Sequence, residues 1–248
     1  MSTHQDAEPE INNGSFDSAA FAAATLASWQ TLAAVIDHTL LKPEATRAQV
    51  ESLCAEASRY RFACAMVNPV WASTAVGLLS GTGVTVGVVI GFPLGASLVS
   101  TLRQEAAALS RLGARELDMV IPIGLLKSGD NRGVQNAIRT TAAVAHHHGA
   151  LLKVILENAL LTVEEKLRGS EMAIQAGADF IKTSTGFSSG GATAADVALM
   201  RGVAGNRCGV KAAGGIRTLA DVKAMLEAGA TRIGASASVA IVREMGAE

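Results

Sequence analysis

Eight short apolar runs rich in Val and Ile dominate the sequence from residue 35 onward, and amphipathic segments of about 12 residues separate them. This alternation is typical of βα units, in which helices connect the strands of a parallel sheet. Across residues 35–248, eight such units take about 27 residues each, close to the usage of a (β/α)8 barrel. The runs are residues 35–40, 62–68, 84–92, 116–122, 152–158, 180–186, 209–215 and 232–236.

We therefore predict the α/β class and a single closed (β/α)8 TIM barrel over residues 35–248. An open, doubly wound sheet remains an alternative, although the GxGxxG phosphate turn is absent after the first run. Residues 1–16 are polar and acidic and predict a mobile tail, whereas the Ala-rich residues 17–34 predict a helix. Residues 1–34 are thus expected to form an N-terminal extension ahead of the catalytic barrel.

Composition excludes several classes of protein. Apolar residues make up 49% of the chain, charged residues 17%, and the net charge is −1, so a large core is expected and nucleic acid is not a partner. The longest apolar stretch, residues 84–96, is shorter than the roughly 20 residues of a membrane span. Three scattered cysteines and the absence of Lys or Arg before Lys42 predict a cytoplasmic protein. Nothing in the sequence points beyond a small assembly, and a homodimer is the largest that we expect.

Lysines interrupt three of the predicted strands. Both faces of a parallel barrel strand are covered, so these strands should be apolar throughout, yet they contain Lys153, Lys182 and Lys211. Successive lysines are 29 residues apart, one βα unit, which predicts equivalent heights on consecutive strands. Asp118 lies on the strand before Lys153. We expect these four side chains to meet inside the barrel.

A buried amine is costly unless it is paired, and it responds by losing its proton more readily. Two neighbouring ammonium groups repel each other, which lowers the pKa of one of them further and makes it a nucleophile near neutral pH. The site therefore predicts carbonyl chemistry through an imine. For a single strand lysine, the alternative is a side chain that extends to solvent at the barrel mouth. Three such lysines at a fixed interval favour the catalytic interpretation.

Glycine-rich loops follow the last three predicted strands. Backbone N–H groups at such loops and at the helix N-termini that follow them bind anions, and barrel enzymes often hold phosphate after strands 7 and 8. Plain turns are the alternative interpretation of the same residues. The loops contain Thr185-Gly186, Ala213-Gly214-Gly215 and Gly234-Ala235-Ser236.

Over about residues 35–243, the chain resembles the class I deoxyribose-phosphate aldolases. The resemblance rests on residues 36–43 (IDHTLLKP), 90–95 (IGFPLG), 117–121 (LDMVI), 126–130 (LKSGD), 152–155 (LKVI), 180–187 (FIKTSTGF) and 210–217 (VKAAGGIR). It implies a lyase of deoxyribose phosphate catabolism that cleaves 2-deoxy-D-ribose 5-phosphate reversibly to D-glyceraldehyde 3-phosphate and acetaldehyde. It also implies that the enzyme needs neither a cofactor nor a metal, and that its partners are a small sugar phosphate and an aldehyde.

The resemblance also implies roles for individual residues. Lys182 would form the Schiff base, Lys211 would be the neighbouring cation that lowers its pKa, and Asp118 would relay protons with ordered water. Lys153 would support Asp118, and Asp37 would be a second carboxylate near the site. The 5-phosphate would be bound by Gly186, Gly214, Gly215, Gly234 and Ser236.

The chain departs from the usual pattern of these aldolases at several positions. It lacks the C-terminal tyrosine that some members use in proton transfer, since its only tyrosine is Tyr60. Other departures are Met66, Pro122, Asn158 and Ala237, which stand where Cys, Asn, Thr and Ser are common.

Two histidine motifs admit other interpretations. Consecutive helical residues project about 100° apart, so the run 146–148 is expected to be a solvated helix end and not a metal site. Adjacent strand residues face opposite ways, so we assign Asp37 to the barrel interior and His38 to a structural role. Two rival functions remain: another Schiff-base barrel aldolase, such as a transaldolase or a pyruvate-dependent lyase, and a non-catalytic barrel that binds a sugar phosphate.

Overall fold

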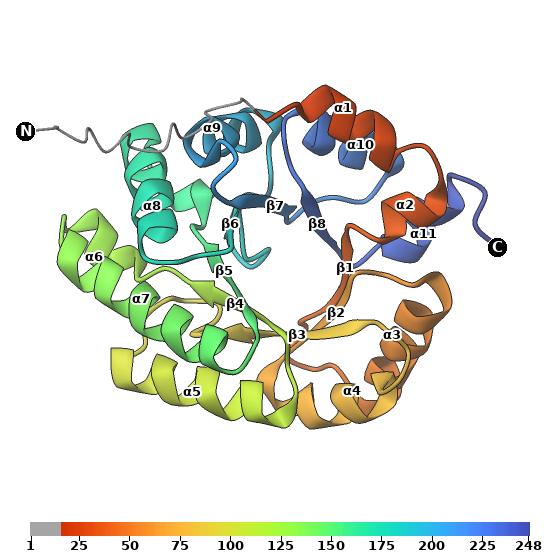
Figure 1. Cartoon of the computed structure of the whole chain (residues 1–248), viewed down its shortest axis with the longest axis horizontal. Helices are drawn as coiled ribbons and strands as arrows, with labels where there is room; N and C mark the ends of the chain where they lie inside the picture. Colours follow the sequence, from red (N-terminus) through yellow and green to blue (C-terminus); the bar gives the residue numbers. More distant parts are fainter. Residues whose placement is uncertain (1–15) are drawn as a thin grey trace, which may run out of the picture.

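Eight parallel strands close into a barrel in the computed structural model, which describes residues 16–248 (Figure 1). Strand β1 pairs with β8 as well as with β2, so the predicted (β/α)8 barrel is confirmed and the open sheet is excluded. Each strand lies within a predicted run, except that β5 begins one residue earlier. The strands are β1 (Ile36–Leu40), β2 (Cys64–Val67), β3 (Thr85–Ile90), β4 (Glu116–Val120), β5 (Leu151–Ile155), β6 (Phe180–Lys182), β7 (Gly209–Ala213) and β8 (Arg232–Ala235).

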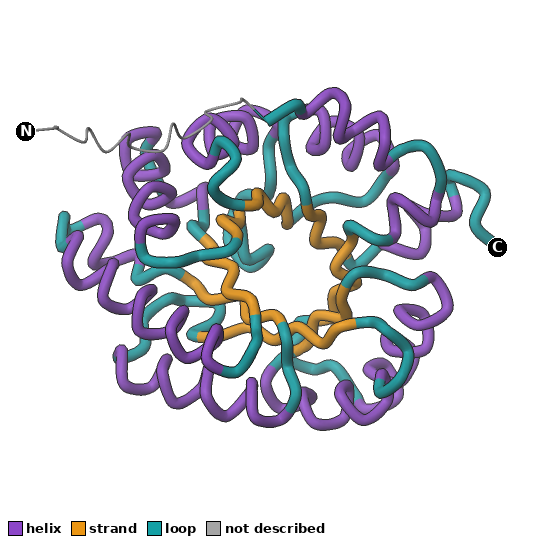
Figure 2. Tube along the Cα trace, in the orientation of Figure 1, coloured by secondary structure: helices purple, strands orange, loops and turns teal. Residues whose placement is uncertain are grey.

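The helices form a ring outside the strands, as Figure 2 shows in purple around orange. None of those in residues 16–248 combines the length and the apolar character needed to cross a bilayer. Around the barrel they are α3 (Arg47–Tyr60), α4 (Ala72–Leu79), α5 (Val99–Leu112), α6 (Ile123–Lys127), α7 (Asn131–His147), α8 (Val163–Gln175), α9 (Ala194–Ala204), α10 (Leu219–Glu227) and α11 (Ser238–Arg243). Two single 3-10 turns, η1 (Pro69–Trp71) and η2 (Asn158–Leu160), follow β2 and β5.

Capping boxes mark where several barrel helices begin. Thr162 accepts a hydrogen bond from the Glu165 backbone while the Glu165 side chain accepts one from the Thr162 backbone. Thr218 and Asp221 make the same exchange at the start of α10. These caps fix where the loops that follow β5 and β7 at the C-terminal rim of the barrel stop.

The N-terminal extension differs from the prediction of one helix over residues 17–34. Two helices occupy it, α1 (Ser18–Thr25) and α2 (Trp29–Ala33), because Ser28 forms a capping box with Thr31 and starts a new helix. Helix α1 packs against α10 and α2 against α11, so the first two helices lie beside the last two (Figure 1). Of the predicted tail 1–16, residues 1–15 lie outside the described part of the chain.

Side chains alternate between the two faces of each strand and so define two different interiors. On β4, Leu117 and Met119 face the helices and are fully buried in the main apolar core, whereas Asp118 faces the barrel axis. A smaller apolar cluster of Cys64, Met66 and Val89 packs with Leu41 at β1–β3. The polar side chains are concentrated elsewhere around the axis and form the candidate site.

Valine truncation on β3 tests where the core lies. Val88 is fully buried, so Val88→Ala should lower the free energy of unfolding by about 2 kcal/mol through lost burial and an unfilled cavity. Urea denaturation measures the change. Val70→Ala is the matched control, because Val70 is 78% exposed and should change stability by less than about 0.5 kcal/mol. Equal losses in the two variants would contradict this assignment of the core.

Candidate active site

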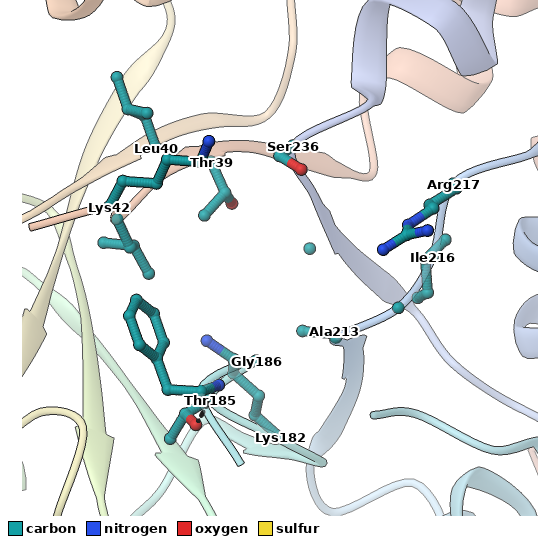
Figure 3. A pocket seen from close by; sticks show the side chains of 15 residues that line it. Thr39, Leu40, Lys42, Lys182, Thr185, Gly186, Ala213, Ile216, Arg217 and Ser236 are labelled. Carbon is teal, nitrogen blue, oxygen red and sulfur yellow. Dashed lines mark hydrogen bonds between the residues drawn. The ribbon is translucent and has the colours of Figure 1, made fainter. Parts of the chain in front are cut away.

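A cavity of about 450 Å³ opens at the C-terminal ends of strands β1, β6, β7 and β8. Lys182 lines the cavity, and its amine points into the space between the surrounding loops (Figure 3). Arg217 reaches toward the same space from the loop after β7. All five residues predicted to bind phosphate line this cavity: Gly186, Gly214, Gly215, Gly234 and Ser236.

The structure brings Asp118 together with all three strand lysines. Its Oδ2 accepts hydrogen bonds from Lys182 Nζ at 2.9 Å and from Lys211 Nζ at 2.7 Å. Its Oδ1 accepts one from Lys153 Nζ at 2.8 Å. The four residues are at most 3% exposed, so one desolvated carboxylate pairs with three amines.

The expectation that the three lysines lie at equal heights is wrong for Lys153. Lys211 pairs in register with Lys182, but Lys153 pairs with Phe180, two residues earlier on β6. Strands of a closed barrel are staggered relative to one another, so equal intervals in sequence do not ensure equal heights. Lys153 is in register instead with Asp118.

A layer of ion pairs surrounds Lys153 below Lys182. Lys153 forms close ion pairs with Glu116 and lies 3.4 Å from Asp37, while Arg232 contacts Asp37 at 2.8 Å and Glu116 at 3.2 Å. Asp37 also pairs with Lys211. Glu116 and Arg232 are not among the site residues predicted from the sequence. Glu116 had a usable signal, because it precedes Asp118 by two residues and therefore shares its face of the strand.

The surroundings separate the pKa values of Lys182 and Lys153. Burial lowers the pKa of Lys182 from 10.5 to about 8, and the nearby Lys211 and Lys153 lower it too, against the opposing effect of Asp118. Burial also acts to lower the pKa of Lys153, but Asp118, Asp37 and Glu116 together raise it well above 10.5. Lys182 pairs with one carboxylate and Lys153 with three, so Lys182 releases its proton far more readily.

Asp118 stays ionised in this setting. Burial alone would raise its pKa, but Lys153, Lys182 and Lys211 hold the pKa well below its usual value. A carboxylate that is ionised and hydrogen-bonded to the nitrogen of Lys182 can accept a proton from a group attached to that nitrogen.

One group of residues in the described chain has metal-binding spacing: the ligand atoms of Asp37, Cys64 and Glu116 lie within 4.8 Å of one another. The two carboxylates already form ion pairs with Lys153 and Arg232. Burial raises the pKa of the Cys64 thiol well above its usual value, and the negative charges of Glu116 and Asp37 raise it further. A cation would therefore have to displace existing partners, and the donor set fits an ion-pair network better than a metal site.

None of the histidines in residues 16–248 lines this cavity. His38 Nε2 lies 2.8 Å from a carboxylate oxygen of Glu56, and its ring packs on Phe62, while Asp37 faces the interior as expected. His146 Nε2 lies 2.8 Å from Asp179 at the end of α7. Both interactions are structural contacts between neighbouring elements.

Several residues that line the cavity were not assigned from the sequence. Lys42 and Thr39 come from the end of β1, and Phe187 comes from the loop after β6. Arg217 had a signal, since it follows the glycine pair Gly214-Gly215 just before α10. Lys42 and Phe187 had none beyond their place after a strand.

The four residues that depart from the usual pattern of the aldolases lie in different parts of the structure. Met66 is fully buried in the small inner cluster, and Asn158 is buried with its amide near Met200 Sδ. Pro122 and Ala237 occupy the N-cap positions of α6 and α11, and neither offers a side-chain cap bond. None of the four forms a side-chain hydrogen bond with the three lysines.

Comparison with known proteins places the chain in one group. A family sequence profile described as "DeoC/LacD family aldolase" matches residues 31–247. Deoxyribose-phosphate aldolase of Lysinibacillus sphaericus (strain C3-41) is 54% identical over 213 residues, covering 86% of this chain and 95% of the relative. Deoxyribose-phosphate aldolase of Geobacillus sp. (strain WCH70) is 54% identical over 211 residues, covering 85% of this chain and 94% of the relative. Among solved structures, the deoxyribose phosphate aldolase of Aeropyrum pernix, described as tetrameric, superposes with a TM-score of 0.85 at 36% identity, covering 92% of this chain and 96% of its own.

Replacing Lys182 tests how much its buried charge lowers the free energy of unfolding. Its pKa is about 8 in the folded chain against 10.5 ordinarily, so the unfolded state holds the proton more tightly and Lys182 lowers stability at every pH below about 8. Lys182→Met should therefore raise the free energy of unfolding at pH 7 by about 3 kcal/mol. The gain should shrink as the pH rises from 8 to 10.5, where the folded protein no longer carries the charge.

Denaturant titrations across that pH range measure the difference. Lys223→Met is the control, because Lys223 is exposed on α10 and should show no such pH-dependent gain. A Lys182→Met variant less stable than the parent at pH 7 would contradict the prediction, because it would show that the amine stabilises the fold.

Proposed function

The chain belongs to the DeoC/LacD family of aldolases, and from this premise we propose that it cleaves 2-deoxy-D-ribose 5-phosphate reversibly to D-glyceraldehyde 3-phosphate and acetaldehyde. The observation that carries the proposal is the position of Lys182. Its amine has a pKa near 8 and points into a cavity whose other wall consists of glycine loops and Arg217 (Figure 3). A nucleophile for a carbonyl group and donors for a phosphate thus face one another.

In the synthetic direction, neutral Lys182 attacks the carbonyl carbon of acetaldehyde and forms a carbinolamine. Loss of water gives an iminium ion, and Asp118 with water removes a proton from the methyl group to yield the enamine. The enamine carbon attacks the aldehyde of glyceraldehyde 3-phosphate, whose oxygen takes up a proton. Hydrolysis of the new iminium then releases the sugar and restores the lysine amine.

Lys211 and the lower layer prepare Lys182 for this chemistry. The Lys211 ammonium 2.7 Å from Asp118 shares the carboxylate with Lys182 and helps to lower the Lys182 pKa. Lys153 holds the other oxygen of Asp118 at 2.8 Å and keeps the carboxylate directed at the lysine pair. Asp37 anchors Lys211 from below.

The phosphate would lie among the loops after β6, β7 and β8. Backbone N–H groups at Gly186, Gly214 and Gly215 and the Ser236 hydroxyl suit an anion, and Arg217 supplies a positive charge. Binding the phosphate far from the reacting carbonyl orients the acceptor and lowers the entropic cost of the reaction.

Two other functions make different predictions. An aldolase with another donor would form an imine with pyruvate or dihydroxyacetone in preference to acetaldehyde. A non-catalytic barrel would bind a sugar phosphate saturably without a covalent adduct. The homodimer and the cytoplasmic location stay predictions.

Borohydride trapping tests the proposed chemistry. Reduction in the presence of 2-deoxyribose 5-phosphate should attach the substrate to Lys182, as located by peptide mass spectrometry. Lys182→Leu should abolish the adduct and lower kcat at least 1000-fold, since the nucleophile is lost. Lys223→Leu, an exposed lysine on α10, should behave like the parent. An adduct on another lysine would move the site, and no adduct would refute the substrate.

Arg217 tests the phosphate end of the cavity. Arg217→Ala should raise KM for 2-deoxyribose 5-phosphate about 10–100-fold, because a charge-assisted hydrogen bond is lost. KM for 2-deoxyribose, which lacks the phosphate, should stay within about twofold. Arg103→Ala on the exposed face of α5 serves as the control. Equal losses for both sugars would place the phosphate elsewhere.

A further inference from the structure

Glu157 is a buried carboxylate that the proposed mechanism does not use. It follows β5 and is only 2% exposed. Its backbone is left-handed, with φ of 61°, which is unfavourable for a residue with a side chain. This conformation turns the chain at the end of the strand, and the side chain crosses to the loop after β6.

The side-chain hydrogen bonds of Glu157 are with one residue of that loop. Its Oε2 accepts hydrogen bonds from the Thr185 hydroxyl and, at 3.3 Å, from the Thr185 N–H. The hydroxyl has a single proton, so donating it to Glu157 leaves the oxygen free to accept. The Phe187 N–H donates to that oxygen at 3.0 Å. This chain of hydrogen bonds spans Gly186 from both sides.

From this geometry we propose that Glu157 is a positioning residue that holds residues 185–187 in the shape required to bind the substrate phosphate. The proposal rests on the proposed function, because it assigns Gly186 to the phosphate site. Glu157 itself touches no reacting atom and acts through Thr185.

The effect of Glu157 extends to the neighbouring loop. Ala192 N–H donates to the Gly214 carbonyl at 2.9 Å, and a Cβ on Gly191 would lie 2.3 Å from the same oxygen. The loop after β6 therefore lies directly against the glycine pair after β7. A shift of residues 185–187 would disturb Gly214 as well as Gly186.

The amine end of the cavity has supports of its own. The Lys182 carbonyl accepts a hydrogen bond from Leu156 N–H at 2.9 Å, and Thr183 N–H donates to the Lys211 carbonyl at 3.1 Å. The Thr183 hydroxyl donates to the Ala213 carbonyl at 3.0 Å. These bonds hold Lys182 in the barrel without Glu157, so loss of Glu157 should affect phosphate binding and spare imine formation.

Fold stability does not account for Glu157. Within residues 16–248 its second oxygen, Oε1, is buried without a hydrogen-bond partner, which is unfavourable for the folded state. The left-handed backbone is a second unfavourable feature. A residue that lowers stability twice while bonding one loop of the cavity is better explained by the shape of that loop.

Substitutions that separate hydrogen bonding from charge test the proposal. In Glu157→Leu, KM for 2-deoxyribose 5-phosphate should rise about tenfold or more, whereas borohydride trapping of acetaldehyde on Lys182 should stay within about twofold. Glu157→Gln should remain close to the parent, because its amide oxygen still accepts from Thr185. Glu51→Leu, at an exposed position of α3, is the matched control.

Hydrogen exchange supplies a readout that needs no activity. Amides of residues 185–190 should exchange at least tenfold faster in Glu157→Leu than in the parent or in Glu157→Gln, while those of β6 and of Thr183 should not change. Thr185→Val removes the bridging hydroxyl and should accelerate the same amides, which keeps the test valid if the leucine variant fails to fold. Adding Glu157→Leu to Thr185→Val should increase exchange and KM little further, because both substitutions break one chain of bonds.

The outcomes separate this inference from the proposed function. Unchanged exchange at residues 185–190, or equal losses of imine trapping and phosphate affinity, would refute the positioning role. An inactive parent protein with no imine would refute the proposed function. Faster exchange confined to that loop would then still support Glu157 as the residue that holds it.

Discussion

The charge balance inside the barrel governs the rest of the site. Three carboxylates, those of Asp37, Glu116 and Asp118, face four basic side chains in one desolvated cluster. With every group ionised, this cluster carries one surplus positive charge, which is costly in a medium of low dielectric constant. Losing a proton from Lys182 removes the surplus, and Lys182 is the member of the cluster with a single carboxylate partner that also borders the cavity. The charge balance that lowers the cost of burying these ionised groups thus places the neutral amine at the cavity.

The staggered register divides this cluster into two layers with different properties. In the lower layer, Lys153 and Arg232 are surrounded by carboxylates, and both have pKa values raised above their usual range. Burial opposes these shifts, but the ion pairs outweigh it. In the upper layer, Lys182 and Lys211 share Asp118 as neighbours in register. Gly234 serves this packing too, because a Cβ there would lie 3.0 Å from Lys211 Cε. The glycine predicted to bind phosphate therefore also makes room for the second lysine.

The sequence predicts the barrel well because the spacing of apolar runs and the motifs that begin and end helices are local properties. Alternating apolar runs and capping boxes such as Thr162–Glu165 depend on neighbours in the chain, and the structure contains both. The relative heights of residues on different strands are not local properties, since they depend on the stagger of the closed barrel. Equal sequence intervals therefore predict Lys153 one layer too high. The break between α1 and α2 was missed because Ala-rich helical propensity outweighed the weaker cap signal of Ser28. Glu157 could not be found from sequence, because its partner Thr185 is 28 residues away and its role depends on a left-handed turn.

Under the proposed function, a single segment of chain relates the two ends of the reaction. Lys182 is the last residue of β6, and Gly186 follows it by four residues, so the amine and the first phosphate-binding loop belong to one continuous stretch. Four extended residues span at most about 14 Å, which limits how far apart the backbones of Lys182 and Gly186 can lie. The strand end is fixed by barrel hydrogen bonds, whereas the loop end depends on Glu157 through Thr185. Selectivity for the length of a phosphorylated substrate therefore depends on a side chain that never contacts it. A rigid amine alone would form imines with aldehydes of any length, and it is the position of this loop that distinguishes among them.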